Sequence, residues 1–230
     1  MTFSLRALAL GAISLGLAAC ASETDTPTPL EGETDVNEAV ADIPMGTYSL
    51  DVLHSELGFR VRHLGISNVD GTFEDFSGSI TVPEDGLSGM SATVTAQIAS
   101  IETGNDDRNG HLRGDDFFAA EEHPELTFQT TSVTATGGGE FEMTGDLTMR
   151  GTTLPVTLQG EYLGTATSPQ GVQKIGFQAS GEINRQDWGL SWAQTNEAGE
   201  IIVADTVTLM ISAQGDLQSA EAEEATPTDA

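Results

Sequence analysis

The sequence predicts an all-β domain that closes into an antiparallel barrel of about eight strands, with a β-sandwich as the alternative. Apolar and polar residues alternate along most of residues 46–215, which is the pattern of strands with one buried face. Clusters of glycine, proline and aspartate separate the alternating segments, as turns do. Only residues 105–122 depart from this pattern. A barrel is favoured because closure removes the exposed strand edges of a β-protein.

The alternation is clearest in four segments, residues 57–61, 92–98, 154–158 and 203–211. In each of them one parity holds Leu, Ile, Val, Phe or Ala, with Asp205 as the exception, and the other holds mainly polar or small residues. We count about nine strand candidates, and some of them are expected to be halves of one long bent strand. The expected turns are residues 83–86, 137–139, 168–171 and 197–199.

Residues 105–122 are the one helical candidate. The segment carries clustered Asp, Asn and Gly residues, and then Asp115 and Asp116 followed by two phenylalanines and two alanines. Asp115 is a good N-cap, and Pro124 ends the helix because the residue before a proline avoids the helical region. We therefore expect one short helix that covers part of the barrel as a lid.

The N-terminus resembles the signal of a bacterial lipoprotein. Residues 1–19 carry one basic side chain, an apolar run too short to span a bilayer, and small residues before Cys20. The resemblance implies that Cys20 is acylated and anchors the protein in the periplasm to the outer membrane, since Ala21 and Ser22 follow it rather than Asp. An ordinary secretory signal cleaved near Ala19, with an incidental cysteine, is the alternative.

Acidic segments flank the domain. Residues 20–45 hold seven Asp or Glu residues and no Lys or Arg, and residues 216–230 have a similar composition. Low hydrophobicity with charge of one sign predicts disorder. We therefore expect a disordered tether and a disordered tail around a domain of residues 46–215.

The composition excludes several classes of function. The chain has 36 acidic and 8 basic residues and a formal net charge of −28, which leaves no basic face for a nucleic acid. The single cysteine excludes a disulfide framework and a zinc site built from cysteines. We expect no nucleic acid partner and no cofactor.

Catalytic and metal-binding patterns are absent from the sequence as well. No Gly-x-Ser-x-Gly motif occurs, and His54, His63, His111 and His123 have no zinc-type spacing. We therefore expect a protein that is not an enzyme and that binds no metal. An enzyme acting on the isoprenoid is a further alternative. It would need a polar cluster with strongly shifted pKa values inside the barrel, for which His54, His111 and a carboxylate are the candidates.

The interior of the predicted barrel offers room for a ligand. Eight of the nine phenylalanines lie within the domain, and several inward positions carry small residues. A barrel of about eight strands is wide enough for its own side chains or for one small ligand. The small inward residues favour a cavity; they are Gly71, Ala92, Ala96, Gly160, Ala179 and Gly181.

Five motifs follow one another along the domain. They are Asp51-x-x-His54-Ser55 with Phe59 and His63-x-Gly65, Gly71-x-Phe73-x-x-Phe76-x-Gly78, Arg108-x-x-His111-Leu112, Gly145-x-Leu147-Thr148-x-Arg150-Gly151, and Asn184-Arg185-x-Asp187-Trp188-Gly189. Together they resemble the YceI-like family of exported polyisoprenoid-binding proteins. The resemblance implies a lipocalin-like antiparallel barrel around an isoprenoid chain, with no established catalytic residues. Two residues depart from the family pattern. Asn109 stands where the family often has Asp, and Trp188 stands where Phe is more usual. The larger ring of Trp188 can narrow the interior or cover one end.

We expect the ligand to contact inward apolar side chains of the strands and a gate on the helical segment. The lining residues are Leu57, Phe59, Val61, Phe73, Phe76, Phe128, Val156, Phe177 and Leu209, and the gating residues are Leu112, Phe117 and Phe118. Arg185 is expected to be structural, because pairing with Asp187 or Asp205 would fasten strand ends.

The few cations are the candidates for headgroup contacts. Arg60 and Arg62 share the polar face of one strand, whereas Arg108, His111 and Arg113 lie on the helical segment. If the arginines converge at the mouth of the barrel, they can bind an anionic head. Otherwise a neutral, quinone-like head is favoured, and we prefer it because 24 acidic and 7 basic residues give the domain a net charge of −17.

The predicted function is a periplasmic lipoprotein that carries or sequesters a polyisoprenoid lipid inside its barrel. The alternative is a stress-related interaction or scaffold protein whose barrel core is filled. A continuous internal void would favour the first function, and a solid interior would favour the second. The sequence leaves a monomer or a homodimer open.

Overall fold

The computed structural model describes residues 43–195, 197–199 and 201–218. The predicted signal peptide, Cys20, most of the acidic tether and the tail from residue 219 lie outside these residues. Within the described residues, no helix is long and apolar enough to cross a bilayer. The last strand continues to Leu217, so residues 216 and 217 belong to the barrel and not to the predicted tail.

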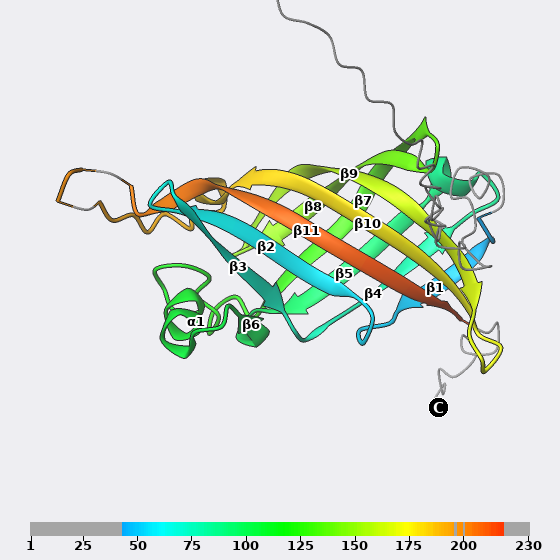
Figure 1. Ribbon diagram of the computed structural model, residues 1–230, viewed down its shortest axis with the longest axis horizontal. Coiled ribbons are helices and arrows are strands. Elements are labelled where there is room, and N and C mark those ends of the chain that lie inside the picture. Colours follow the sequence, from blue (N-terminus) through cyan, green and yellow to red (C-terminus); the bar gives the residue numbers. More distant parts are fainter. Residues whose placement is uncertain (1–42, 196, 200, 219–230) are drawn as a thin grey trace, which may run out of the picture. The chain divides into compact units, whose positions relative to one another are not determined.

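Eleven antiparallel strands form one sheet that closes on itself (Figure 1). Their order is β1-β4-β5-β7-β8-β9-β10-β11-β2-β3-β6, and pairing of β1 with β11 closes the barrel. The strands are β1 (Gly46–Leu50), β2 (Glu56–His63), β3 (Ser67–Phe73), β4 (Phe76–Val82), β5 (Ser91–Gln97), β6 (Ile101–Glu102), β7 (Glu125–Gly137), β8 (Glu140–Met149), β9 (Thr152–Thr167), β10 (Gln173–Asn184) and β11 (Val203–Leu217).

Three pairs of these strands are halves of longer bent strands. Strands β1 and β2 are the halves of the first bent strand, because both pair with the same edge of β11, while β10 pairs with its other edge. In the same way β3 leads into β4, and β5 leads into β6 through the 3₁₀ helix η3 (Ile98–Ser100). Three bent strands and the five strands β7–β11 give an eight-stranded barrel, which confirms the predicted fold.

The short helix lies earlier than predicted. Helix α1 spans Asp106–Arg113, and the side chain of Asn105 caps it by accepting a hydrogen bond from the backbone N–H of Arg108 at 2.9 Å. The prediction that Asp115 caps a helix is wrong, because residues 115–122 form consecutive turns. The signal for the true position was acidic residues in the first turn and basic residues in the last, which suit the helix dipole.

Two further 3₁₀ helices are η2 (Gly86–Gly89) and η4 (Arg185–Trp188). The buried apolar side chains form two clusters. One cluster lies beside α1 and includes Phe73 and Phe118. The other includes Tyr48 on β1 and Tyr162 on β9, which are 0% and 1% exposed. Strand β1 lies at the end of the barrel away from α1 (Figure 1). The end opposite α1 is therefore packed, and the α1 end holds the candidate entrance.

Aromatic rings cover two of the three glycines that were expected to face inward, Gly71 and Gly160. A Cβ atom on Gly71 would lie 2.3 Å from the ring of Phe59, and one on Gly160 would lie 2.3 Å from the ring of Phe141. Each phenylalanine pairs with its glycine across two neighbouring strands. The expectation that these glycines leave open space is therefore wrong, since they let a ring lie flat against the wall.

Polar contacts fasten the β1–β2 bend to the strands beside it. Lys174 Nζ on β10 donates to Asp51 Oδ2 at 3.1 Å and also pairs with Asp216 on β11. The side-chain amide of Gln214 donates to the same Asp51 oxygen at 2.8 Å. The Asp51 side chain is only 12% exposed, so these contacts hold the barrel seam where β1 ends.

Replacing Asp51 with Asn should reduce stability near neutral pH and have little effect in acid. Burial raises the pKa of Asp51, but hydrogen bonds from His54, Lys174 and the Leu53 N–H lower it by more. The net result is a pKa of about 2, below the ordinary 3.8. A depressed pKa stabilises the fold above about pH 4, and this contribution disappears as the pH falls toward 2. Urea unfolding should therefore show a loss of about 2 kcal/mol near pH 7 that shrinks near pH 2.5.

The control for this prediction is Asp70→Asn on the outer surface. Asp70 pairs with Arg60, but its side chain is 54% exposed, so its loss should change stability by less than about 1 kcal/mol. Equal effects of the two substitutions across the pH range would contradict the role assigned to Asp51.

Candidate ligand-binding site

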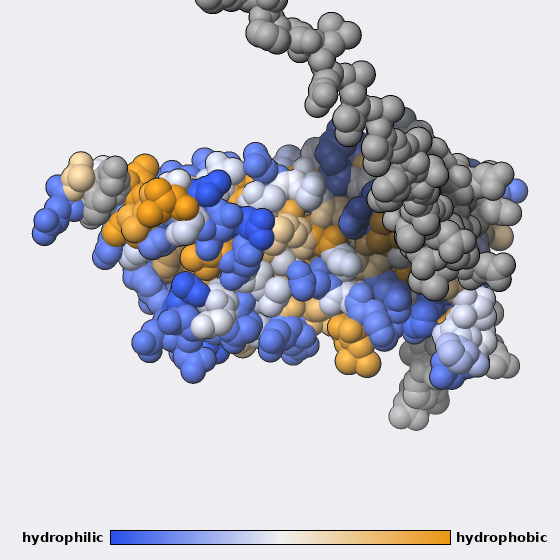
Figure 2. Space-filling view, in the orientation of Figure 1, coloured by the Kyte–Doolittle hydropathy of each residue, from blue (hydrophilic) through white to orange (hydrophobic). Residues whose placement is uncertain are grey.

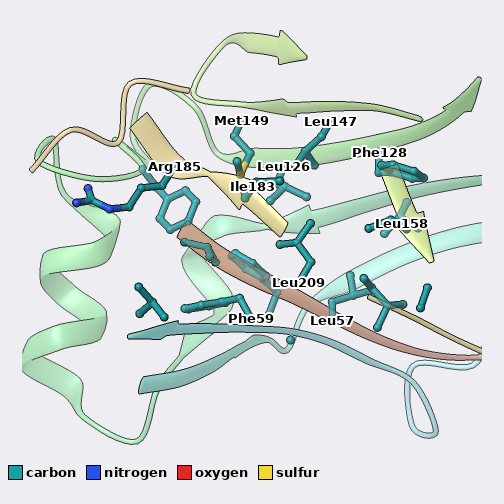
Figure 3. Close-up of a pocket in the computed structure, with 18 of the residues that line it drawn as sticks. Leu57, Phe59, Leu126, Phe128, Leu147, Met149, Leu158, Ile183, Arg185 and Leu209 are labelled. Atoms are coloured by element: carbon teal, nitrogen blue, oxygen red, sulfur yellow. The ribbon is translucent and has the colours of Figure 1, made fainter. Parts of the chain in front are cut away.

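The barrel encloses a cavity of about 460 Å³ (Figure 3). Every strand except β6 contributes to its wall, together with α1 and the segment before β11. This volume falls within the range of small-molecule sites, which is about 300–1,000 Å³. The wall is almost entirely apolar, and its polar side chains are Ser55, His63, Arg108, His111, Arg185 and Ser212. The interior is hollow, as the predicted lipid-binding function needs.

Ten of the twelve predicted contact residues line the cavity. They are Leu57, Phe59, Val61, Phe73, Leu112, Phe117, Phe118, Phe128, Phe177 and Leu209. The prediction is wrong for the other two, Phe76 and Val156. They are 7% and 4% exposed and pack in the core beside α1 without lining the cavity. Alternation specifies the face on which a side chain lies, but its neighbours decide whether it meets the void.

Several lining residues were missed by the sequence interpretation. Leu126 lies two positions before Phe128 on β7, and Leu147 and Met149 share one parity on β8 (Figure 3). The same alternation that predicted Phe128 could have identified them. Trp192 lies outside any strand, so no periodic pattern marks it.

Aromatic side chains gather where the cavity reaches α1. The ring of His111 lies 5.0 Å from that of Phe117 and 5.2 Å from that of Trp192, and the last two rings are 5.3 Å apart. Phe118 packs edge-on against Phe73 with ring centres 6.0 Å apart. We call this region the mouth; α1, the turns after it and the segment before β11 together build it.

The candidate headgroup arginines do not converge at the mouth. Arg60 lies on the outer face of β2, where it donates to both carboxylate oxygens of Asp70 at 2.5 and 2.7 Å. Arg62 is exposed on that same face, and Arg113 donates to two backbone carbonyl oxygens. None of these three side chains lines the cavity. The condition set for an anionic head is therefore not met.

Arg108 and His111 do line the cavity, and both have protein partners. Arg108 donates from Nε to Thr103 Oγ1 at 2.8 Å and from Nη2 to the Thr103 carbonyl at 2.7 Å. His111 Nε2 lies 2.8 Å from Asp116 Oδ2. Arg108 keeps its positive charge at the mouth, because its Thr103 partners are neutral, whereas His111 faces the carboxylate of Asp116.

Arg185 fastens the end of β10 to the strand beside it. Its side chain is 4% exposed, and Nη2 donates to Asp205 Oδ1 at 2.8 Å. Its other donors reach the backbone carbonyl oxygens of Ala204, at 3.0 Å, and of Leu190. The predicted structural pairing is confirmed with Asp205, although part of the side chain also lines the cavity (Figure 3).

Asn109 is buried at the base of α1 and has a complete set of partners. Its Oδ1 accepts from the Thr103 N–H at 3.0 Å and from the Thr103 hydroxyl at 2.6 Å, while its Nδ2 donates to Glu102 Oε2 at 2.9 Å. The bond from Asn109, followed by one from the Gly104 N–H, lowers the pKa of Glu102. The amide therefore supplies a donor that a carboxylate at position 109 would lack.

Replacing Asn109 with Asp should destabilise the protein near neutral pH. The new carboxylate would face Glu102 without the bridging N–H, at a position only 2% exposed. We expect a loss of about 2 kcal/mol in urea unfolding, which becomes smaller in acid as one carboxyl is protonated. Asn184→Asp is the matched control, because Asn184 caps η4 as an acceptor and Asp caps equally well. Full stability of Asn109→Asp at neutral pH would contradict this account.

The histidines do not form a shared site. His54 bonds to Asp51 at 2.8 Å in the β1–β2 bend and does not line the cavity, whereas His111 lies on α1. Among the residues that the structure describes, no group of three or more His, Cys, Asp or Glu side chains is placed to hold a metal ion. His54 and His111, the candidate histidines of an enzymatic site, therefore do not meet inside the barrel.

Comparison with known proteins agrees with this architecture. Residues 48–215 match the YceI-like domain. The chain belongs to the YceI-like family. A UPF0312 protein of Photorhabdus laumondii is 41% identical to it over 143 residues, which cover 61% of this chain and 74% of that protein.

Two solved structures share the YceI-like barrel. The YCEI protein of Campylobacter jejuni is 33% identical, with a TM-score of 0.60 over 75% of this chain and 98% of that one. A polyisoprenoid-binding domain from Saccharophagus degradans has a TM-score of 0.56 over 76% of this chain and 100% of that one. Because the second protein is 18% identical, it supports the fold alone. The lipocalin-like YceI fold predicted from the motifs is confirmed.

Trp188 does not narrow the interior of this YceI-like chain, which was one of the two roles expected of the larger ring. Its side chain is 3% exposed, and its indole N–H donates to the carbonyl of Leu147 at 3.0 Å. It does not line the cavity. The indole therefore ties η4 to β8 within the wall, and it does not narrow the interior.

Proposed function

We propose that this YceI-like protein binds a polyisoprenoid lipid inside its barrel, and that it carries or sequesters the lipid without changing it chemically. The observation that supports this most directly is the apolar cavity of about 460 Å³. An isoprenoid chain has methyl branches and no polar groups along its length, so it suits a wall of Leu, Ile, Val, Phe and Met side chains. Membership of the YceI-like family adds support, because a solved structure of the same fold is described as a polyisoprenoid-binding domain.

The lipid head is proposed to be neutral, such as a quinone. An anionic head would need several free cations at the mouth. Of the four candidate arginines, Arg60, Arg62 and Arg113 do not line the cavity, so Arg108 alone of this set brings a guanidinium to the mouth. A neutral head with hydrogen-bond acceptors needs only single donors, which the mouth can supply.

Reversible loading follows from the state of the lipid before binding. Moving about forty chain carbons out of water at ~0.8 kcal/mol each would exceed about 30 kcal/mol, above the ~20 kcal/mol ceiling for non-covalent binding. A lipid that leaves a bilayer is already out of water, so its transfer into an apolar cavity is nearly neutral. Fit and access then control binding, which allows a carrier to release its load.

The proposed location is the periplasm, with the domain anchored to the outer membrane through an acylated Cys20. The signal-like residues 1–19 and the small residues before Cys20 support this location. The acidic residues that follow would let the barrel reach away from the membrane surface.

Mass spectrometry of the lipid extracted from purified protein tests the proposed function. Protein exported to the periplasm of a Gram-negative host should yield a long-chain isoprenoid, with neutral quinones as the main species. Mainly isoprenyl pyrophosphates would refute the neutral head, and no isoprenoid would refute the function.

Two neighbouring residues of β10 provide matched variants for this experiment. Ala179 lines the cavity, whereas Ser180 is exposed on the outer face. Ala179→Phe should fill the cavity and remove most of the bound lipid, while Ser180→Phe should leave it unchanged. Equal lipid content in the two folded variants would show that the lipid does not occupy this cavity.

A further inference from the structure

Exposed apolar side chains cluster at the edge of the mouth. The turn between β2 and β3 presents Ile66, which is 83% exposed, and the segment before β11 presents Ile201, which is 55% exposed. Leu64 and Ile202, beside them, are half-buried. Figure 2 shows an apolar patch at this end of the molecule. We call these four residues the rim.

The two segments of the rim are joined, and they are continuous with the cavity. The Leu64 N–H donates to the Ile202 carbonyl at 2.8 Å, and His63 pairs with Val203 across β2 and β11. The side chains of His63, Ile202 and Val203 also line the cavity. A lipid that enters beside these residues would therefore pass directly from the rim into the barrel.

The conformation of the β2–β3 turn does not explain its apolar sequence. Leu64 has φ 52° and Gly65 has φ 70°, so both residues lie in the left-handed region. Glycine or asparagine adopts this region with less strain than leucine. Ile66 adds nothing to the core, because it lies in solvent. The turn thus keeps a strained leucine and an exposed isoleucine where polar residues would serve the fold better.

The rim also lacks acidic residues in a strongly acidic protein. Residues 61–69 and 201–204 contain no Asp or Glu, although the whole chain has a formal net charge of −28. Arg62 and His63 are the titratable side chains of the first segment. The rim itself therefore carries no negative charge, and the flanking Asp70 and Asp205 are paired with Arg60 and Arg185. Little unpaired negative charge would have to be brought against a bilayer here.

We propose that the rim docks on a zwitterionic lipid bilayer and that the cavity loads from the bilayer at this point. This inference rests on the proposed lipid-binding function. Four apolar side chains are far fewer than the roughly 20–30 residues that each partner contributes to a stable protein interface. They are enough for shallow insertion into the boundary between headgroups and acyl chains. Docking there would let a lipid enter the barrel without crossing water.

The first test compares lipid uptake from two sources by the full acylated protein. The rim variant is Ile66→Asp with Ile201→Asp, and the control is Val52→Asp with Leu53→Asp in the β1–β2 bend. The control residues are also exposed, at 47% and 87%. From phosphatidylcholine vesicles containing an isoprenoid quinone, the rim variant should load about 10-fold more slowly than wild type, and the control should load normally. From detergent micelles all three should load equally.

The second test uses Trp192, which lies at the mouth beside the rim. The Ile202 N–H bonds to the carbonyl of Gln194, which places the segment after Trp192 against the rim, whereas the other tryptophan, Trp188, is 3% exposed in the wall. Vesicles of brominated phosphatidylcholine should quench the fluorescence of Trp192 in wild type and in the control, but not in the rim variant.

The outcomes separate the two proposals. Normal vesicle loading by the rim variant, equal slowing of the control, or absence of quenching in wild type would each overturn docking by the rim. Failure of wild type to load from micelles would instead refute lipid binding, and quenching that depends on Ile66 and Ile201 would then still support docking.

Discussion

Replacing Phe59 with Asp should empty the barrel. Phe59 lines the cavity from β2, covers Gly71, and lies with its ring 6.0 Å from that of Phe73. A carboxylate there would remove these contacts and place an unpaired charge in an apolar wall. We expect loss of nearly all co-purified lipid and a decrease of about 3 kcal/mol or more in the free energy of unfolding. Mass spectrometry of the extract and urea unfolding measure the two effects.

The control for Phe59→Asp is Thr208→Asp, which adds the same charge outside the barrel. Thr208 pairs with Arg60 across β11 and β2, and it does not line the cavity. This variant should keep its lipid and most of its stability. A folded Phe59→Asp protein that retains the wild-type amount of lipid would show that the ligand binds elsewhere.

Replacing Arg185 with Met should destabilise the barrel strongly. The substitution keeps apolar volume but leaves Asp205 and several backbone carbonyl oxygens without their donor. Because Arg185 is buried while Asp205 is 37% exposed, we expect a loss of about 2–3 kcal/mol, most of it from the carbonyl oxygens that lose their donor. Urea unfolding of the lipid-free protein should show this loss, because the role assigned to Arg185 does not depend on ligand.

Two further variants define what Arg185 contributes. Arg185→Lys should recover only part of the stability, because an ammonium group cannot donate in several fixed directions. Arg113→Met, at an exposed arginine on α1, should cost less than about 1 kcal/mol. Full stability of Arg185→Met would mean that the arginine serves the ligand and not the strand ends.

The barrel was predictable because its signal is local. Residues 57–61 and 203–211 alternate apolar and polar side chains, and they form β2 and most of β11 as predicted. The helix was harder to place, since Asn105 and Asp115 are both good caps. The difference is that Asn105 precedes a segment with acidic and then basic residues, whereas Asp115 precedes turns.

The sequence by itself determined the strands, the face on which each side chain lies, and the scarcity of cations. Only the tertiary structure decided which inward residues meet the void, because that depends on side chains from distant strands. Phe76 and Val156 face inward and are covered, while Trp192 belongs to no strand and reaches the mouth. The rim is also a tertiary feature, since Ile66 and Ile201 lie 135 positions apart and become neighbours only when β2 pairs with β11.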